Sequence, residues 1–368
     1  MRFLWTDRFT KLWRWVLLAL RWHGREDVRL DDADTPGAPP DGSAVVEVAF
    51  TGICGTDLHE YRHGPNMIRL DPHPLTGARP PIVMGHEFSG RVVAMSRPWP
   101  GVSEGSRVAI DPCLACGECA WCLRGDYHIC ARGGSIGLAS DGALARYVTV
   151  PLRSLCPVPD EVSDEWAALA EPLAVGLHAA TRAGVRAGDS VLVLGAGPIG
   201  LAAILGARAS GASAVFVSEP VGARHGAAMA AGATDVFDPT SADVRREVFL
   251  RTGRLGPRIA IDATGRPEVV DLGIRSLQRG GTIAVAGITD SILNTDLRQI
   301  VLYERTICGS LGYNFDIPRV LGLMAAGRLD PSCLLTDTRP LTDAVDTFAE
   351  LAAGGHNHLK ILLRPEEN

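Results

Sequence analysis

Five of the nine cysteines in this chain of 368 residues lie within one short segment, between Cys113 and Cys130. Four of them follow the spacing Cys116-x2-Cys119-x2-Cys122-x7-Cys130. Thiolates at such spacings suit a tetrahedral zinc ion with no open coordination position. A closed site of this kind holds a loop together and has no vacancy for a substrate. We therefore predict a structural zinc site here, with Cys113 as a neighbour that is not a ligand.

A disulfide framework is the alternative explanation of so many cysteines. The odd number of cysteines, the length of the chain and the lack of a convincing signal peptide argue against it. The composition, with 46% hydrophobic and 21% charged residues, is that of a globular protein, and the length predicts about two domains. A net charge of -6 without a long run of Lys or Arg lacks the basic footprint of nucleic-acid binding. We expect a cytoplasmic protein with no nucleic-acid partner.

Residues 1–20 interleave tryptophans with basic residues and end in the apolar run Val16–Leu20. This run is shorter than the core of a signal peptide and far too short to span a bilayer. A basic amphipathic helix on a membrane surface is the alternative. We expect instead a loose extension over residues 1–18, a first strand at Leu18–Trp22 and no membrane partner.

The strand and helix patterns change near residue 169. Before it, β-branched runs separated by Gly- and Pro-rich connections predict a mainly β unit with strands at 44–52, 88–95, 107–110 and 145–150. After it, continuous apolar runs alternate with Ala-rich helical stretches, which predicts a doubly wound parallel sheet of α/β class. Its strands are expected at 191–194, 214–218, 235–237, 259–262, 282–286 and 307–311. Helices at 317–326 and 343–353 and a strand at 360–363 are expected to return to the first unit.

A glycine motif, Gly195-Ala196-Gly197-Pro198-Ile199-Gly200, follows one of these strands and opens a helical stretch. Gly195 permits the tight turn, Gly197 lets the backbone approach a pyrophosphate, and Gly200 lets helix and strand pack closely. Pro198 and Ile199 suit the first helical turn. We predict a dinucleotide site with the pyrophosphate at the helix N-terminus.

The residue that ends the next strand indicates which dinucleotide binds. Glu219 lies nineteen residues after Gly200, where an acidic side chain accepts hydrogen bonds from the ribose hydroxyls and repels a 2′-phosphate. This favours NAD over NADP. Arg224 lies nearby and weakens the preference, since a cation there is able to hold the extra phosphate.

A second set of metal ligands lies outside the cysteine cluster. Cys54, the pair His86-Glu87 and Glu171 stand next to glycine or proline. A catalytic zinc needs about three protein ligands of the sulfur, nitrogen and oxygen types and an open position for substrate. All three ligand types are available in this set.

At these motifs the chain resembles the zinc-dependent medium-chain alcohol dehydrogenases and, within them, the (R,R)-2,3-butanediol dehydrogenase group. The resemblance covers roughly residues 19–365 and rests on the segments 52–61, 72–77, 85–90, 116–130, 171–175 and 195–200. It implies a GroES-like catalytic domain over residues 19–172 and 313–368, and a Rossmann domain that binds NAD over residues 173–312. It also implies a homodimer or homotetramer.

The resemblance further implies roles for single residues near the second metal set. Cys54, His86 and Glu171 are the implied ligands of a catalytic zinc, and Glu87 is either a ligand or an adjacent carboxylate. Asp57 is implied to orient the His86 imidazole.

A proton relay is also implied, running from the substrate through the Thr56 hydroxyl and the cofactor ribose to His59. A further route would run through Glu87 and water. The implied reaction interconverts a small secondary alcohol or vicinal diol with its ketone, with NAD as the hydride carrier and 2,3-butanediol and acetoin as the expected pair. Sorbitol or another polyol, and L-threonine, are alternative substrates. The alternative from another functional class is a non-catalytic binding protein that is stabilised by zinc. The four-cysteine loop alone would be sufficient for such a protein. The enzyme hypothesis predicts two zinc ions per chain, one catalytic and one structural.

Overall fold

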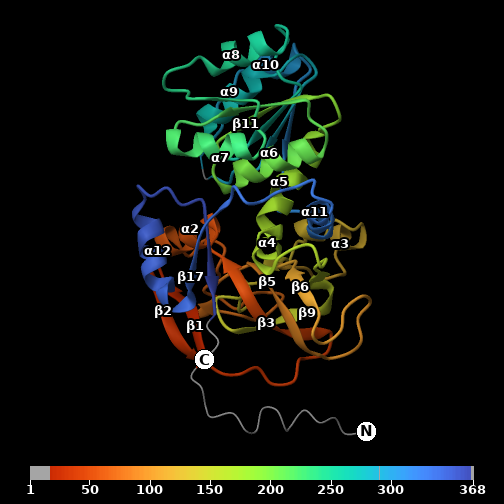
Figure 1. Ribbon diagram of the computed structural model, residues 1–368, viewed down its shortest axis with the longest axis vertical. Helices are drawn as coiled ribbons and strands as arrows, with labels where there is room; N and C mark the ends of the chain where they lie inside the picture. Colours follow the sequence, from red (N-terminus) through yellow and green to blue (C-terminus); the bar gives the residue numbers. More distant parts are fainter. Residues whose placement is uncertain (1–16, 290, 366–368) are drawn as a thin grey trace.

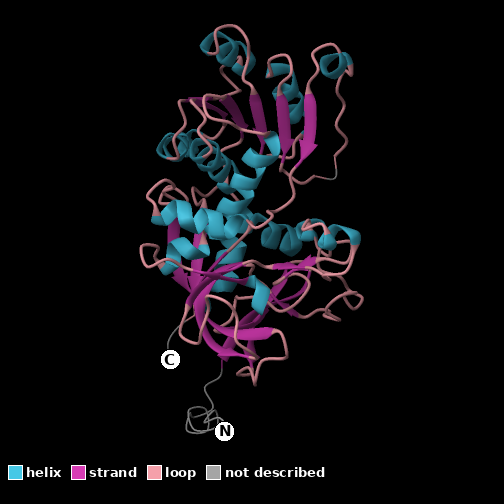
Figure 2. Cartoon of the chain, turned by 90° about the vertical axis from the view of Figure 1, so that its right-hand side faces the viewer, coloured by secondary structure: helices cyan, strands magenta, loops and turns pink. Residues whose placement is uncertain are grey.

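The computed structural model describes residues 17–289 and 291–365. The chain forms two lobes that are stacked along the long axis of the molecule (Figure 1). Strands dominate the lower lobe, whereas helices flank a parallel sheet in the upper one (Figure 2). Residues 1–16 of the predicted extension lie outside the described residues. The first strand, β1 (Leu17–Gly24), begins one residue before the predicted start, so Leu17 and Leu18 belong to it rather than to the extension.

The upper lobe contains a parallel sheet in the order β13-β12-β11-β14-β15-β16. This is the strand order of a Rossmann domain, and the predicted doubly wound sheet is confirmed. The strand bounds are β11 (Ser190–Leu194), β12 (Ala214–Ser218), β13 (Asp235–Phe237), β14 (Ile259–Asp262), β15 (Thr282–Val285) and β16 (Thr306–Gly309). The central strand β11 is buried from Val191 to Leu194 because helices cover both faces, which explains its unbroken apolar run.

Helices connect these strands. Their bounds are α6 (Pro198–Ala209), η3 (Gly222–Arg224), α7 (His225–Ala230), α8 (Val244–Arg251), α9 (Pro267–Ser276) and α10 (Arg298–Val301). The longer α5 (Ala170–Ala183) enters from the lower lobe and packs on α6 (Figure 1). The domain boundary predicted at 172/173 therefore falls inside a helix that joins the lobes, and the one at 312/313 falls between β16 and α11 (Asp316–Ala325).

The lower lobe is built on a sheet in the order β10-β6-β5-β3-β18-β17, with β9 also paired to β3. The bounds of these strands are β3 (Ser43–Gly52), β5 (Glu87–Met95), β6 (Arg107–Ile110), β9 (Tyr147–Pro151), β10 (Leu155–Pro157), β17 (Leu335–Pro340) and β18 (Lys360–Arg364). The smaller sheets hold β1, β2 (Asp27–Ala33), β4 (Ile82–Val83), β7 (Cys113–Leu114) and β8 (Gly134–Ser135). The remaining helices are α2 (Gly55–His63), α3 (Ala120–Leu123), η1 (Tyr127–Ile129), η2 (Leu152–Ser154), α4 (Asp164–Ala168), η4 (Leu341–Asp343) and α12 (Ala344–Ala353).

The C-terminal segment returns to the first lobe, as predicted. Figure 1 shows α12 and β17 in the lower lobe. In β18, Leu362 and Leu363 pair antiparallel with the end of β3, and β17 runs parallel to β18. Strand β17 was not predicted from the sequence. It lies at the edge of the sheet and reads Leu-Thr-Asp-Thr-Arg-Pro, so it lacks the buried apolar face that marks a strand in a sequence. No helix of the described residues is long and apolar enough to cross a membrane.

Candidate active site

Three of the predicted metal ligands meet where β3 ends and β5 begins. Glu87 opens β5 opposite Gly52 of β3, and Cys54 follows two residues later as the N-cap of α2. Since the strands are antiparallel, this register brings Cys54 next to His86 and Glu87. Their ligand atoms all lie within 4.8 Å of one another. One thiol, one imidazole and one carboxylate form a donor set that fits a catalytic zinc.

Asp57 lies behind this cluster and is fully buried. Its Oδ2 accepts a hydrogen bond from the Cys54 amide at 2.9 Å, and its Oδ1 lies 3.5 Å from His86 Nδ1. An imidazole whose Nδ1 faces a carboxylate presents Nε2 to a metal. Burial lowers the pKa of His86, but the negative charges of Asp57 and Cys54 outweigh this effect and raise the pKa well above its usual value. A metal at this site must therefore displace a proton.

A residue that the sequence analysis did not identify completes the cluster. Lys360, the first residue of β18, places its ammonium against both carboxylate oxygens of Glu87 in the buried interior. A signal for it is present in the sequence. Of the 36 Lys and Arg residues only two are lysines, Lys11 and Lys360. In a chain that otherwise uses arginine, a lysine that opens an apolar strand indicates a site that needs a compact ammonium.

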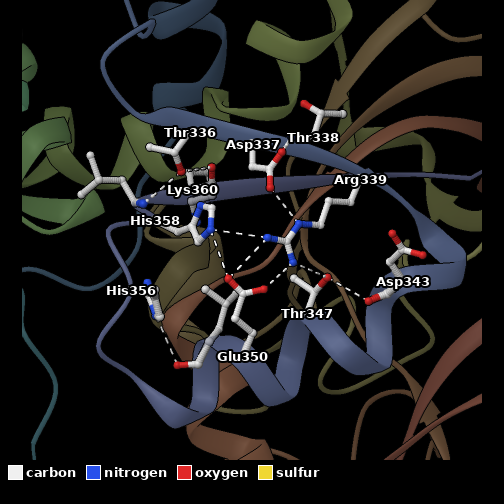
Figure 3. A network of polar contacts seen from close by, with 12 residues as sticks. Thr336, Asp337, Thr338, Arg339, Asp343, Thr347, Glu350, His356, His358 and Lys360 are labelled. Atoms are coloured by element: carbon white, nitrogen blue, oxygen red, sulfur yellow. Dashed lines mark hydrogen bonds and ion pairs between the residues drawn. The ribbon is translucent and has the colours of Figure 1, made fainter.

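A polar network anchors the segment that leads into Lys360 (Figure 3). The Arg339 guanidinium of β17 pairs with Asp337 at 2.8 Å and with Glu350 of α12 at 2.7 Å. His358 Nε2 lies 3.2 Å from the other Glu350 oxygen. This network ties β17, α12 and the loop before β18 together, and so fixes the start of the strand that carries Lys360.

Glu171 lies in the first turn of α5, on the helix that packs against the upper lobe. Burial and the charge of Glu87 raise its pKa to about 7, against the lowering effects of His86 and Lys360. Glu171 thus lies within electrostatic reach of the cluster. It lies outside the close group of three ligand atoms among the described residues.

The two predicted relay residues lie on α2. Cys54 Sγ contacts Thr56 Oγ1 at 3.6 Å, so the Thr56 hydroxyl borders the cluster. His59 is exposed on the same helix, and its Nδ1 lies 3.1 Å from the Asn66 amide nitrogen. Its neighbour is therefore an amide rather than an acidic side chain.

The four-cysteine loop has the geometry of a tetrahedral thiolate site. The Sγ atoms of Cys119 and Cys122 lie 3.5 Å apart, those of Cys116 and Cys130 also 3.5 Å, and those of Cys116 and Cys122 3.9 Å. Zinc–sulfur bonds of ~2.3 Å in a tetrahedron place the sulfurs about 3.8 Å apart. A disulfide would need about 2.05 Å. Cys113 lies outside this group of four.

The glycine motif lies in the predicted position between β11 and α6. Gly195 adopts a φ of 92°, which favours glycine, and a Cβ on Gly200 would lie 2.0 Å from the Gly195 carbonyl oxygen. Gly197 is the N-cap of α6, and Pro198 is its first residue, followed by Ile199. Pro198 has no N–H, so the anion site at this helix start is formed by the other amides of the first turn.

Glu219 and Arg224 both lie beside this motif. Glu219 is buried at the end of β12, where its carboxylate accepts hydrogen bonds from the Ala196 amide at 2.6 Å and the Val221 amide at 2.8 Å. Arg224 Nη1 lies 3.9 Å from Glu219 Oε2, and its side chain remains 36% exposed. The Glu219 carboxylate thus holds the backbone of the glycine turn through the Ala196 amide, whereas the Arg224 guanidinium is accessible to solvent.

Comparisons with known proteins agree with this arrangement. Residues 40–160 match the family model of the alcohol dehydrogenase GroES-like domain, and residues 198–326 match that of the zinc-binding dehydrogenases. The chain is 36% identical to an (R,R)-butanediol dehydrogenase of Bacillus subtilis, over 94% of this chain and 99% of that one. It is 32% identical to an L-threonine 3-dehydrogenase of Pyrococcus furiosus, over 89% and 92% of the two chains.

Solved structures show the same architecture. The crystal structure of 2R,3R-butanediol dehydrogenase from Bacillus subtilis superposes with a TM-score of 0.88 at 35% identity, covering 95% of this chain and all of that one. A zinc-binding dehydrogenase from Sinorhizobium meliloti bound to NADP gives a TM-score of 0.85 at 29% identity, covering 96% and 100%. With the two matching family models and the shared lobes, these relatives show that the chain belongs to the zinc-dependent medium-chain alcohol dehydrogenases.

Proposed function

We propose that this enzyme transfers a hydride between NAD and a small secondary alcohol or vicinal diol, with (R,R)-2,3-butanediol and acetoin as its substrate pair. The observation that carries the chemistry is the buried meeting of Cys54, His86 and Glu87. The choice of substrate rests on the similarity to butanediol dehydrogenases over nearly the whole chain. A polyol such as sorbitol, or L-threonine, is the alternative substrate.

Cys54, His86 and an acidic residue would hold the catalytic zinc. When bound, zinc supplies a Lewis acid for the substrate oxygen, and the nicotinamide supplies the hydride acceptor. The chain's own residues orient the site and move the proton. Asp57 fixes the His86 ring, and the Thr56 hydroxyl beside Cys54 accepts the proton of the substrate alcohol while it releases its own hydroxyl proton toward His59. His59 passes that proton to solvent from its exposed position on α2.

NAD is the proposed cofactor because of the negative charge at the end of β12. Glu219 lies beneath the turn that receives the pyrophosphate, and a 2′-phosphate would add a second negative charge near its carboxylate. Arg224 stands next to it and opposes this effect. The expected result is a preference for NAD with measurable use of NADP.

We also propose that each chain binds two zinc ions. The separation of the Sγ atoms in the four-cysteine loop supports the structural ion, and the S, N and O donors around Cys54 support the catalytic one. All nine cysteines have free thiols, which suits the reducing cytoplasm as the compartment.

A homodimer or homotetramer is the proposed assembly. Strand β16 lies at the edge of the upper sheet and is exposed along most of its length, so its backbone is open to pairing. Apolar side chains are exposed around this edge, including Leu297, Val301, Leu302 and Ile307. An edge strand bordered by apolar residues is typical of an interface. Light scattering of the purified protein tests this proposal, and a monomer at micromolar concentration would contradict it.

A substrate panel tests the proposed reaction. The three stereoisomers of 2,3-butanediol, sorbitol and L-threonine are each supplied with NAD, and the absorbance of the reduced cofactor is followed. The highest kcat/KM is expected for the (2R,3R) isomer. A higher value for L-threonine or sorbitol would assign the enzyme to the alternative substrate, and no reduction with any of these alcohols would contradict the proposal.

A further inference from the structure

A pocket of about 480 Å3 opens on the upper lobe, away from the glycine motif and the two metal sites. It lies between α8, α9 and the segment before β16. Five of the eleven residues that line it are arginines, and none is acidic. The five are Arg245, Arg254, Arg275, Arg279 and Arg305.

This concentration of positive charge is unbalanced within the protein. The chain as a whole is acidic, with 42 Asp and Glu against 36 Lys and Arg. Arg275 pairs with Asp271 at 2.8 Å. Within residues 17–289 and 291–365, no ion pair is formed by Arg245, Arg254 or Arg279. Gathering like charges in one concave site costs free energy unless an anion compensates them.

The floor of the pocket is built around Tyr303. The guanidinium carbon atoms of Arg279 and Arg305 lie 4.7 and 4.6 Å from the centre of its ring. Arg305 is only 8% exposed, and its Nη atoms donate to Gln299 Oε1 at 3.0 Å and to the Leu277 carbonyl. Its buried Nε has no hydrogen-bond partner among the described residues. Burial and the charges of Arg245 and Arg279 lower the pKa of Arg305. The buried Arg305 guanidinium therefore keeps one N–H donor, at Nε, without a hydrogen-bond acceptor among the described residues.

The pocket is separate from the dinucleotide site. Gln278 and Arg279 precede β15, and Tyr303 and Arg305 precede β16, so these residues lie at the amino ends of the parallel strands. The glycine motif instead follows the carboxyl end of β11. In a parallel sheet, the amino ends of the strands and the carboxyl ends of the strands lie on opposite sides of the sheet. A ligand in the arginine pocket therefore does not compete with the cofactor for space.

We propose that this arginine pocket binds a small polyphosphate anion, of the class that includes nucleoside di- and triphosphates. The planar guanidinium suits phosphate because it donates two parallel hydrogen bonds. Several such groups match a ligand with several negative charges. The volume of the pocket falls within the ~300–1,000 Å3 range of small-molecule sites, and exposed Phe249 and Leu255 provide apolar surface at its rim.

Calorimetric titration of the full-length enzyme with inorganic tripolyphosphate tests the proposal. The titration is made in saturating NAD, so that the glycine motif is occupied. The variants are Arg245→Gln and Arg279→Gln, both of exposed side chains whose loss leaves the buried contacts of Arg305 in place. Loss of one charged hydrogen-bond donor is expected to raise the Kd about tenfold. Arg97→Gln, an exposed arginine of the lower lobe, is the matched control and should leave the Kd unchanged.

Three results would overturn the proposal. The first is no binding to the wild-type enzyme. The second is binding that both pocket variants retain, which would place the anion elsewhere. The third is equal weakening by Arg97→Gln, which would indicate diffuse attraction to surface charge. Vesicles containing phosphatidylglycerol form a separate arm, and sedimentation of the protein with them in the absence of tripolyphosphate binding would indicate a membrane contact instead. A repeat of the titration with ATP measures how much the apolar rim of Phe249 and Leu255 adds to the affinity.

Discussion

The Lys360 ammonium lies 2.7 and 2.6 Å from the two carboxylate oxygens of Glu87 and 3.0 Å from the carbonyl oxygen of Ile53. An ammonium has three N–H donors, and these three acceptors satisfy all of them. Both side chains are buried, at 2% and 0% exposure. The last strand of the chain thus neutralises a carboxylate beside Cys54 and His86. Lys360 thus fixes the position of the Glu87 carboxylate, and either Glu87 or Glu171 would be the acidic zinc ligand.

Replacing Lys360 tests this relationship. Lys360→Met leaves the Glu87 carboxylate buried without a partner, and breaking a buried ion pair costs ~3–5 kcal/mol. We expect the free energy of unfolding to fall by about this amount in denaturant titrations. The double variant Lys360→Met with Glu87→Gln should recover a large part of the loss, because no uncompensated charge remains. Equal stability of the single and double variants would contradict the role assigned to the pair.

Lys360→Arg is the conservative comparison. It keeps the charge but inserts a planar guanidinium into a site that fits a compact ammonium. We expect this variant to bind cobalt at the catalytic site with an altered visible spectrum, since Glu87 would be displaced toward Cys54. An unchanged spectrum would show that the position of Glu87 does not depend on the lysine.

Zinc content should follow the division of the cysteines. Elemental analysis of the wild-type enzyme should give two zinc ions per chain. Cys119→Ser breaks the four-thiolate group and should leave one, with increased protease cleavage between residues 113 and 135. Cys113→Ser is the matched control, because this thiol lies close by but outside the group, and it should retain two.

The elements that could be predicted from the sequence are those whose apolar residues follow a regular strand or helix pattern. Strands β12, β13 and β14 were predicted with their observed bounds because they are short apolar runs flanked by helices, and β12 and β14 are buried along most or all of their length. Strand β17 was not predicted because it lies at the edge of the sheet and its side chains are mostly polar. The metal residues were predictable from residue type and local spacing. Lys360 was not, because its contact with Glu87 joins positions 273 residues apart.

The pH dependence of the metal-free enzyme should report the pair His86 and Asp57. The pKa of His86 is raised in the folded state, so its protonation stabilises the fold. This contribution is fully present below the unfolded pKa of ~6.5 and is lost as the pH rises through the higher folded value. Asp57→Asn removes the charge that raises the pKa and should reduce the contribution. NMR titration of His86 checks this, and an unchanged pKa in the variant would exclude Asp57 as its cause.

Cofactor selectivity should respond to Arg224. Its exposed guanidinium is available to a 2′-phosphate, whereas Glu219 is engaged by two backbone amides. Arg224→Gln should lower kcat/KM with NADP about tenfold and change the value with NAD little, since one charged contact to phosphate is lost. Parallel assays with both cofactors measure the ratio. A larger loss with NAD would show that Arg224 holds the pyrophosphate instead.

His59 should govern the release of the substrate proton. Its ring is exposed on α2, in an edge contact with His63 at 5.2 Å between ring centres. His59→Ala should lower kcat by ~10²-fold, the lower end of the contribution of a positioned acid–base group. It should also remove the acidic limb of the pH profile, and added imidazole should restore part of the rate. His63→Ala is the matched control, since it removes a neighbouring exposed imidazole from the same helix. His63→Ala should keep the wild-type pH profile. If His59→Ala kept it as well, the proton would leave by another route.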